Sequence, residues 1–405
     1  MCKVRVMQCV ACLGMVMTGA LVGGRWQPVA AGGTDSGYRV LKPIESGDLM
    51  LFPVVRADGK PAQGSQFLTL DEGFKSGEVE VTEAGKVRGL VRSRGGSAAP
   101  HYQGDQVNTL VLVNNSKRPL LLLAGEIVTG GKQDRIIAKD RIVPAGADPI
   151  DLSVFCVEHG RWTESSAKFG ATASNDKASF MVQPAVRQEA MVAKSQQQVW
   201  DSVAGAITTM AAVAAPPKAP AAGEAEMIDG RAVSALPMNG RSLGTTSYAK
   251  AMQSGAVSAK VDQEAASVLQ SREQALATLR QEHAVGVVVA VRGEVIWADM
   301  FSDPELLARY WTKLVRSYAA EGLGGGPTHK TATLADAQSF LDAPSHGRED
   351  SEGEVGVYRY REVKTSGTDM FSLESLLPGT GYDVHVSKLK IKGTPVRAAS
   401  GGPVY

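Results

Sequence analysis

The sequence predicts a protein of the α+β class, an antiparallel β-rich sandwich or partial barrel with several packed helices. Short apolar runs separated by turn residues recur between residues 43 and 162, which is typical of antiparallel strands. Helical apolar stripes follow between residues 185 and 322. The 405-residue chain is long enough to bury a sizeable core, and its 44 glycines with only 6% aromatic residues favour a loop-rich β architecture over a large helical bundle.

The first residues have the pattern of a secretion signal. Lys3 and Arg5 precede an apolar stretch, so we expect a signal peptide over residues 1–22, a disordered leader over 23–38, and an exported periplasmic or extracellular chain. The stretch is short for a bilayer span, which favours cleavage over anchoring, and no later segment predicts a membrane span. Three of the four cysteines lie in this signal, so Cys156 would remain alone and no internal disulfide would form.

We expect one main domain over residues 39–322, with its β-rich core over 43–162. The expected strands are 48–55, 78–82, 109–113, 120–123, 135–137, 142–143 and 150–157. Side chains alternate across a strand, so Leu152, Val154 and Cys156 share one face, and their apolar character predicts that this face points inward.

The second part of the main domain, residues 185–322, is expected to hold helices and a β-hairpin. The expected elements are helices 188–207 and 261–282, a hairpin over 285–297, and a helix that begins near Pro304 behind a capping-box pattern. Gly322 should end that last helix, whereas the Ala- and Pro-rich residues 211–223 predict a loop. The boundary after Gly322 leaves residues 323–405 as a polar tail that is partly ordered at most.

The charge balance gives no electrostatic reason to expect a polyanionic partner. The chain has 43 Lys and Arg residues against 42 Asp and Glu residues, a net charge of +1. We therefore expect no nucleic-acid partner. The chain has no His-Glu-x-x-His motif, and Gly130-Gly131 lacks the Lys-Ser/Thr ending of a phosphate loop. No cofactor and no metal is expected.

Two polar blocks, 125–135 and 156–162, form the candidate functional site. Folded as neighbouring strands, they would bring carboxylates, a thiol, an imidazole and guanidinium groups together. The ligand-binding candidates are Glu126, Gln133, Asp134, Arg135, Arg161 and Trp162. The catalytic candidates are Cys156 as nucleophile with Glu158 or His159 as base.

The catalytic candidates each have a structural interpretation as well. Cys156 on an apolar strand face is typical of an inert core thiol, and His159 just after a strand is typical of a surface residue. Glu158 would suit a structural ion pair with Arg135 or Arg161. A zinc site is disfavoured because alternation along a strand turns His159 away from Cys156 and Glu158.

The block from Leu110 to Trp162 resembles the bacterial family named for its association with ADP-ribosylglycohydrolase and rhodanese-phosphatase proteins. The matching features are Gly125-Glu126, Gly130 to Arg135, Val143 to Gly146, Cys156-Val157-Glu158, Gly160-Arg161-Trp162, Gln198-Val199-Trp200, and the hairpin with Phe301 and the Trp311 helix. The resemblance spans residues 40–322 and leaves the tail outside it. It implies a gene association and no particular activity.

Three functions fit these residues. The first is a ligand-binding or sensor domain that contacts a small polar or anionic ligand through Gln133, Arg135 and Arg161. The second is a hydrolase or transferase with Cys156 as nucleophile. The third is a non-catalytic interaction protein of the cell envelope. We favour the first, because amide and guanidinium groups gather there without a complete catalytic set.

Overall fold

The computed structural model describes the larger part of the chain. The described residues are 36–57, 66–84, 109–160, 165–166, 168–170, 180–214, 227–228, 231–232, 243–270, 272–325, 330–344 and 347–391. The expected signal peptide and residues 23–35 of the expected leader lie outside them, and the end of that leader begins the first strand at Tyr38.

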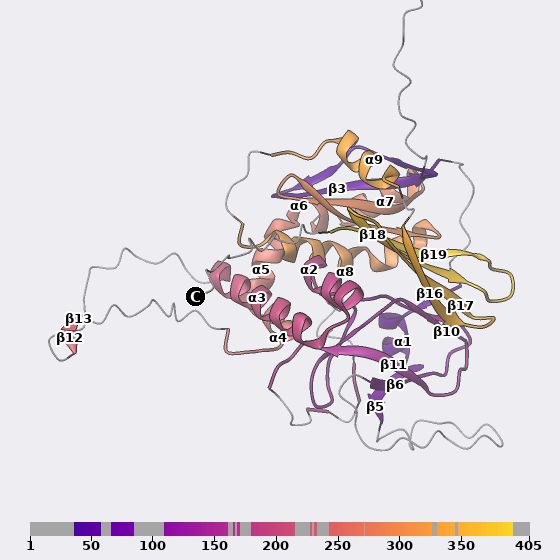
Figure 1. Ribbon diagram of the computed structural model, residues 1–405, viewed down its shortest axis with the longest axis horizontal. Coiled ribbons are helices and arrows are strands. Elements are labelled where there is room, and N and C mark those ends of the chain that lie inside the picture. The colour runs from indigo at the N-terminus through magenta and orange to yellow at the C-terminus, as the bar shows by residue number, and fades with distance from the viewer. Residues whose placement is uncertain are drawn as a thin grey trace, which may run out of the picture. The chain divides into compact units, whose positions relative to one another are not determined.

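A nine-stranded antiparallel sheet is the largest element of the fold (Figure 1). Its strands are β1 (Tyr38–Val40), β2 (Ile44–Ser46), β3 (Leu49–Arg56), β14 (Ala284–Val291), β15 (Glu294–Phe301), β16 (Arg348–Glu354), β17 (Tyr358–Lys364), β18 (Thr368–Ser375) and β19 (Tyr382–Lys390). They lie in the order β1-β3-β14-β15-β19-β18-β17-β16, and β2 pairs with β3. The N-terminal strands therefore share a sheet with the last described strands.

The middle of the chain builds a second β region. Its five-stranded sheet contains β5 (Val79–Glu83), β6 (Thr109–Asn114), β11 (Ile150–Cys156), β9 (Arg135–Ile137) and β8 (Ile127–Val128), in that order. A three-stranded sheet contains β10 (Arg141–Val143), β7 (Leu120–Leu122) and β4 (Leu68–Thr69). Leu112, Leu122 and Leu152 belong to one apolar cluster that these sheets enclose.

Helices pack against and between the β regions. They are α1 (Leu70–Ser76), α2 (Pro184–Gln188), a π-helical turn (Glu189–Ala193), α3 (Gln196–Ala214), α4 (Tyr248–Gln253), α5 (Gly255–Glu264), α6 (Ala266–Leu269), α7 (Arg272–Gln281), α8 (Pro304–Gly322) and α9 (Leu334–Asp342). A two-stranded ribbon contains β12 (Met227–Ile228) and β13 (Arg231–Ala232). None of the described helices combines the length and the apolarity needed to cross a membrane.

Helix α8 joins the β regions and begins as the sequence predicts. Asp303 caps it by accepting a hydrogen bond from the Leu306 amide at 2.9 Å, and Pro304 occupies the first turn. The helix packs on β14 and β15, while its Tyr310 hydroxyl donates to the Leu121 carbonyl of β7 at 3.1 Å. Strands, helices and antiparallel sheets together confirm the predicted α+β class.

Two expected helices are interrupted. The helix expected over 188–207 divides at Lys194, whose φ of 53° is left-handed and ends the π-helical turn. Helix α3 then continues to Ala214, into residues expected to form a loop. The helix expected over 261–282 is replaced by α5, α6 and α7, because the backbone leaves helical geometry at Ala265. The apolar spacing was helical throughout and carried no sign of these breaks.

The C-terminal residues differ most from expectation. Residues 323–405 were predicted as a polar tail outside the main domain, yet α9 and β16 to β19 belong to the same compact unit as the rest of the described chain. Strand β19 pairs with β15 from Trp297↔Leu389 to Phe301↔His385. The polar residues His385, Ser387 and Lys388 of this strand are at most 2% exposed. Their burial is stabilised by partners distant in sequence.

A buried ionic network connects α2, α8 and the nine-stranded sheet with the second β region. Arg187 of α2 donates from Nη1 to Asp299 Oδ2 at 2.9 Å and from Nη2 to Asp299 Oδ1 at 3.1 Å. The hydroxyls of Tyr318 on α8 and Ser387 on β19 also donate to the Asp299 carboxylate. The bidentate pair orients Arg187 against the sheet, where its guanidinium lies 4.6 Å from the Trp297 ring centroid.

His385 extends this network to the second β region. Its Nδ1 lies 2.6 Å from Asp140 Oδ2, and the other Asp140 oxygen accepts the Ala124 amide at 2.7 Å. Its Nε2 lies 3.2 Å from Asp299 Oδ1, within ion-pair distance although not aligned as a hydrogen bond. Burial lowers the pKa of His385, but Asp140 and Asp299 outweigh it and raise that pKa to about 9. Burial raises the pKa of Asp299, but Arg187 and His385 hold it well below its usual value.

Gly125 makes room for this network. Its φ is +87°, and a Cβ there would lie 2.3 Å from Cγ of Arg187. Gly160 has a nearly identical φ of +88°, but beyond its two chain neighbours no described residue has an atom within 4 Å of its Cβ position. Alanine substitutions at the two positions therefore separate two free-energy costs. Both report the cost of a left-handed backbone, and only the one at Gly125 adds the cost of displacing Arg187.

We predict that Gly125→Ala destabilises the protein more than Gly160→Ala. Both alanines carry the left-handed penalty of about 1–2 kcal/mol, and only the first overpacks the core, which adds about 1–3 kcal/mol. Urea unfolding of the two variants measures the difference in the free energy of unfolding. Equal losses would show that Arg187 moves aside without cost and would contradict its place as a fixed brace.

Candidate functional site

The two polar blocks lie on neighbouring strands. Strand β11 pairs with β9 in the register Val154↔Ile137, Phe155↔Ile136 and Cys156↔Arg135. Strand β8 pairs with the other edge of β9. Of the nine candidate site residues, Arg161 and Trp162 lie outside the described residues, and the structure describes the other seven.

Gln133, Asp134 and Glu158 form a buried polar cluster with α4. The Gln133 amide donates to the Glu158 carbonyl at 2.9 Å, and the Asp134 backbone N–H donates to Glu158 Oε2 at 3.1 Å. Ser247, the N-cap of α4, donates its hydroxyl to Asp134 Oδ2 at 2.6 Å. Lys250 lies 3.3 Å from Glu158 Oε1. These side chains hold α4 against the ends of β9 and β11.

Arg135 and Glu126 also point inward. Arg135 is 1% exposed and donates from Nη1 to the Gln133 carbonyl at 2.8 Å. Glu126 is fully buried and accepts from the Lys313 ammonium at 2.6 Å and from the Leu123 amide at 2.7 Å. Burial raises the pKa of Glu126 even though the Lys313 charge opposes the shift. A dissolved ligand reaches neither side chain without movement of the surrounding chain.

Cys156 has the environment of a core thiol. Its side chain is fully buried, and burial raises its pKa to about 11 although Arg135 opposes the shift. The Gln196 side chain, at the start of α3, pairs with the backbone N–H and C=O of Cys156, both at 2.9 Å. The thiol is therefore protonated at neutral pH, which disfavours it as a nucleophile.

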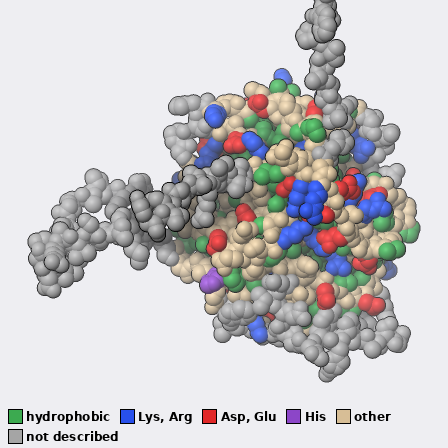
Figure 2. Space-filling view, in the orientation of Figure 1, with side chains coloured by type: hydrophobic (Ala, Val, Ile, Leu, Met, Phe, Trp, Pro, Cys, Tyr) green, Lys and Arg blue, Asp and Glu red, His purple; other side chains and the backbone are tan. Residues whose placement is uncertain are grey.

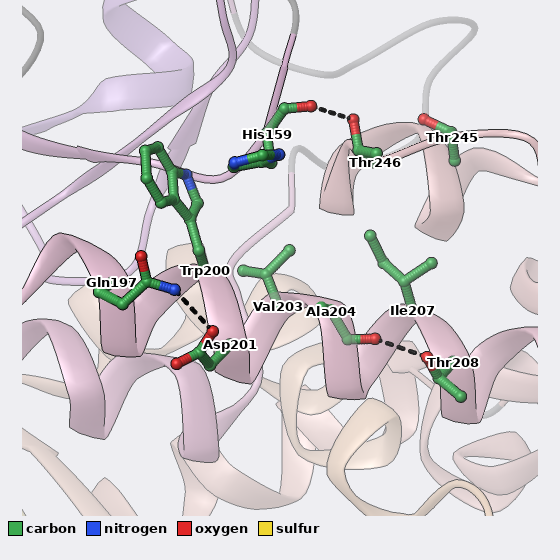
Figure 3. Close-up of a pocket in the computed structure, with 10 residues that line it drawn as sticks. All are labelled: His159, Gln197, Trp200, Asp201, Val203, Ala204, Ile207, Thr208, Thr245 and Thr246. Atoms are coloured by element: carbon green, nitrogen blue, oxygen red, sulfur yellow. Dashed lines mark hydrogen bonds between the residues drawn. The ribbon is translucent and has the colours of Figure 1, made fainter.

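His159 is the described candidate that reaches the surface, and it borders a groove beside α3 (Figure 3). The groove has a volume of about 460 Å³. It is lined by His159, Gln197, Trp200, Asp201, Val203, Ala204, Ile207, Thr208, Thr245 and Thr246. We call it the His159 groove.

The His159 groove combines an apolar floor with polar edges. Figure 3 shows the Trp200 indole beside the His159 imidazole, and the two rings meet edge to face with centroids 4.8 Å apart. The Trp200 indole N–H is buried and has no hydrogen-bond partner among the described residues. Gln197 donates to Asp201 Oδ1 at 2.8 Å, which orients that carboxylate at the edge of the groove. Such a surface suits a small ligand with both an apolar face and hydroxyl or amine groups.

The sequence prediction missed most of this groove. Trp200 falls within the helix expected over 188–207, and neither it nor Gln197, Asp201, Thr245 and Thr246 was a candidate site residue. The Gln198-Val199-Trp200 block, which contributes to the family resemblance, was the available signal. The groove was not predictable because Thr245 and Thr246 lie about ninety residues from His159, and a hydrogen bond from Thr246 to the His159 carbonyl at 2.7 Å brings them together.

The buried ionic network contains the residue types of an acid–base site, but it is closed. Asp140, Asp299 and His385 have no exposed side-chain surface. None of them lines the His159 groove. Among the residues that the structure describes, no three or more His, Cys, Asp or Glu side chains are arranged to hold a metal ion. The network therefore braces the fold.

We predict that Cys156 reacts slowly with a thiol reagent in the folded protein. A pKa of about 11 in place of 9 leaves about one hundredth of the thiolate, and burial slows the reaction further. Iodoacetamide labelling at pH 7.5, followed by mass spectrometry of the Cys156 peptide, compares native protein with protein in urea. Labelling at similar rates in both would contradict the core position of this thiol.

Comparison with known families gives a match that covers most of the chain. The model of the ARG and Rhodanese-Phosphatase-superfamily-associated Protein domain family matches residues 37–389. No curated protein and no solved structure matches the chain. The match extends well past residue 322, where the sequence resemblance was expected to end, and includes β16 to β19 almost to the last residue of β19. The chain therefore belongs to the ARG and Rhodanese-Phosphatase-superfamily-associated Protein domain family.

Proposed function

We propose that the protein is a ligand-binding domain that holds a small polar molecule in the His159 groove. The groove carries this proposal because it is an open hollow of about 460 Å³ at the end of the candidate segment, a size typical of small-molecule sites. The signal-like residues 1–22 support the further proposal that binding takes place in the periplasm or outside the cell.

The described lining favours an uncharged or cationic ligand over an anionic one. It contains the carboxylate of Asp201 and no lysine or arginine. Hydroxyl groups of a ligand would pair with Asp201, Gln197 and the threonines, while an apolar ring face would pack on Trp200. A neutral sugar or polyol has this combination. The guanidinium of Arg161 would favour an anionic ligand. A titration with neutral and anionic ligands distinguishes these two assignments.

The alternative hypotheses have less support. An enzyme with Cys156 as nucleophile would need a reactive thiolate, and the thiol is buried with a raised pKa. A purely structural role describes Gln133, Asp134 and Glu158 well, because these buried residues pair with one another. That role does not account for the open groove next to them. On the face shown in Figure 2, basic and acidic side chains are interleaved.

We predict that a neutral sugar or polyol binds with one-to-one stoichiometry. The Asp201→Asn variant should bind this ligand about tenfold more weakly or worse, because it loses a hydrogen bond to a charged group. Isothermal titration calorimetry would compare neutral mono- and disaccharides, quaternary amines, uronates and sugar phosphates. Trp200→Phe should also weaken binding, because it removes the indole N–H and part of the ring.

The matched control is Asp151→Asn, which changes an exposed carboxylate on β11 outside the groove and should leave affinity unchanged. Binding that is insensitive to both groove variants would place the ligand elsewhere. A preference for uronates or sugar phosphates that is lost in Arg161→Ala would overturn the neutral-ligand assignment. Absence of binding across the panel would contradict the proposal.

A further inference from the structure

Another hollow lies on the face of the nine-stranded sheet that carries α9. Along β18, Phe371 and Leu373 join the core cluster that contains α8, whereas Met370 packs with the cluster that contains Leu341 of α9. Ser372 lies on the same face of β18 as Met370, because side chains alternate between the two faces of a strand. The hollow on this face has a volume of about 160 Å³, and we call it the α9 hollow. It is lined by Ser36, Tyr38, Met300, Leu341, Arg361, Met370, Ser372, Asp383, Val386 and Lys388.

Lys388 supplies a buried positive charge to the α9 hollow. It is 2% exposed, and its ammonium donates to the carbonyls of Leu341 at 2.9 Å and Ala343 at 2.6 Å. These carbonyls lie at the C-terminal end of α9, where a cation is favoured. An ammonium has three hydrogens, so these two bonds leave donor capacity toward the hollow. Burial lowers the pKa of Lys388 to about 8, although Asp342 opposes the shift.

Ser372 and Arg361 add further donors. The Ser372 hydroxyl is buried, with the residue 3% exposed, and has no hydrogen-bond partner among the described residues. Arg361 faces it across the β17–β18 pairing, and its Nη2 donates to Asp383 at 3.3 Å. Its Nε is buried and likewise has no partner in the described part of the chain. A buried polar group without a partner is costly, so an acceptor in the hollow would stabilise both.

We propose that the α9 hollow binds a short-chain carboxylate, with its oxygens toward Lys388, Ser372 and Arg361 and its alkyl part against Met300 and Met370. The lining combines donors with one carboxylate, Asp383, that already pairs with Arg361. Because Asp383 lies beside Arg361, a singly charged carboxylate is repelled less in the hollow than a doubly charged phosphate. The volume is below the roughly 300–1,000 Å³ of drug-sized pockets, which limits the ligand to a few carbon atoms.

The test uses the full chain labelled with ¹³C at the methionine methyl groups. Met300 and Met370 line the hollow, and single Met→Leu variants assign their signals. Propionate is titrated at constant ionic strength, with its uncharged isostere propionamide and with chloride in parallel. We expect saturable shifts of the Met300 and Met370 signals with propionate alone. Linear shifts would show that propionate occupies no specific site, and equal shifts with propionamide would show that the carboxylate is not recognised. Either result would overturn the proposal.

Variants locate the site. Ser372→Ala should weaken propionate binding about fivefold, and Lys388→Met should abolish it. The matched control is Lys390→Met, which removes an exposed lysine two residues along β19 that pairs with Glu294, and should leave binding unchanged. If Lys388→Met fails to fold, Ser372→Ala and Arg361→Gln still decide the outcome. Unchanged affinity in both, or tighter binding of inorganic phosphate than of propionate, would overturn the assignment.

Discussion

The interaction on which the fold depends most is the buried ionic network of Arg187, Asp299, His385 and Asp140. It contacts α2, α8, β15, β19 and the segment between β9 and β10, so one set of side chains fixes the position of five elements. Taking such charges out of water is expensive, and they are tolerated when opposite charges are paired and the remaining polar atoms are bonded. Removing one partner of a buried pair typically costs about 3–5 kcal/mol.

The same logic explains why the charged residues of the candidate segment are poor ligand contacts. Glu126 pairs with Lys313 of α8, and Asp134 and Glu158 bind the start of α4. Asp134 and Glu158 thereby position α4, and the segment before α4 lines the His159 groove. In the proposed function, recognition falls to side chains of α3 and of the segment before α4, which line the His159 groove.

The class of the fold and the pairing of the two polar blocks were predictable, because apolar alternation and turn residues are local signals. Alternation also placed Cys156 on the inward face correctly. The contribution of β19 was not predictable, since its His385, Ser387 and Lys388 have the composition of an exposed segment. They are buried through partners such as Asp140, which lies 245 residues earlier, and Asp299. The His159 groove escaped prediction for the same reason, because one of its walls comes from a separate part of the chain.

The central claim, that the buried network is ionic in the folded protein, is tested most directly by the protonation state of His385. The pKa of His385 is raised from 6.5 to about 9, so its contribution to stability should be complete below pH 6.5 and lost as pH rises through about 9. ¹⁵N-detected imidazole resonances, assigned with His385→Gln, report both ring nitrogens as a function of pH. We predict that both are protonated at pH 7.5 and that the ring loses its proton near pH 9. A neutral His385 ring at pH 7 in the folded protein would contradict this account.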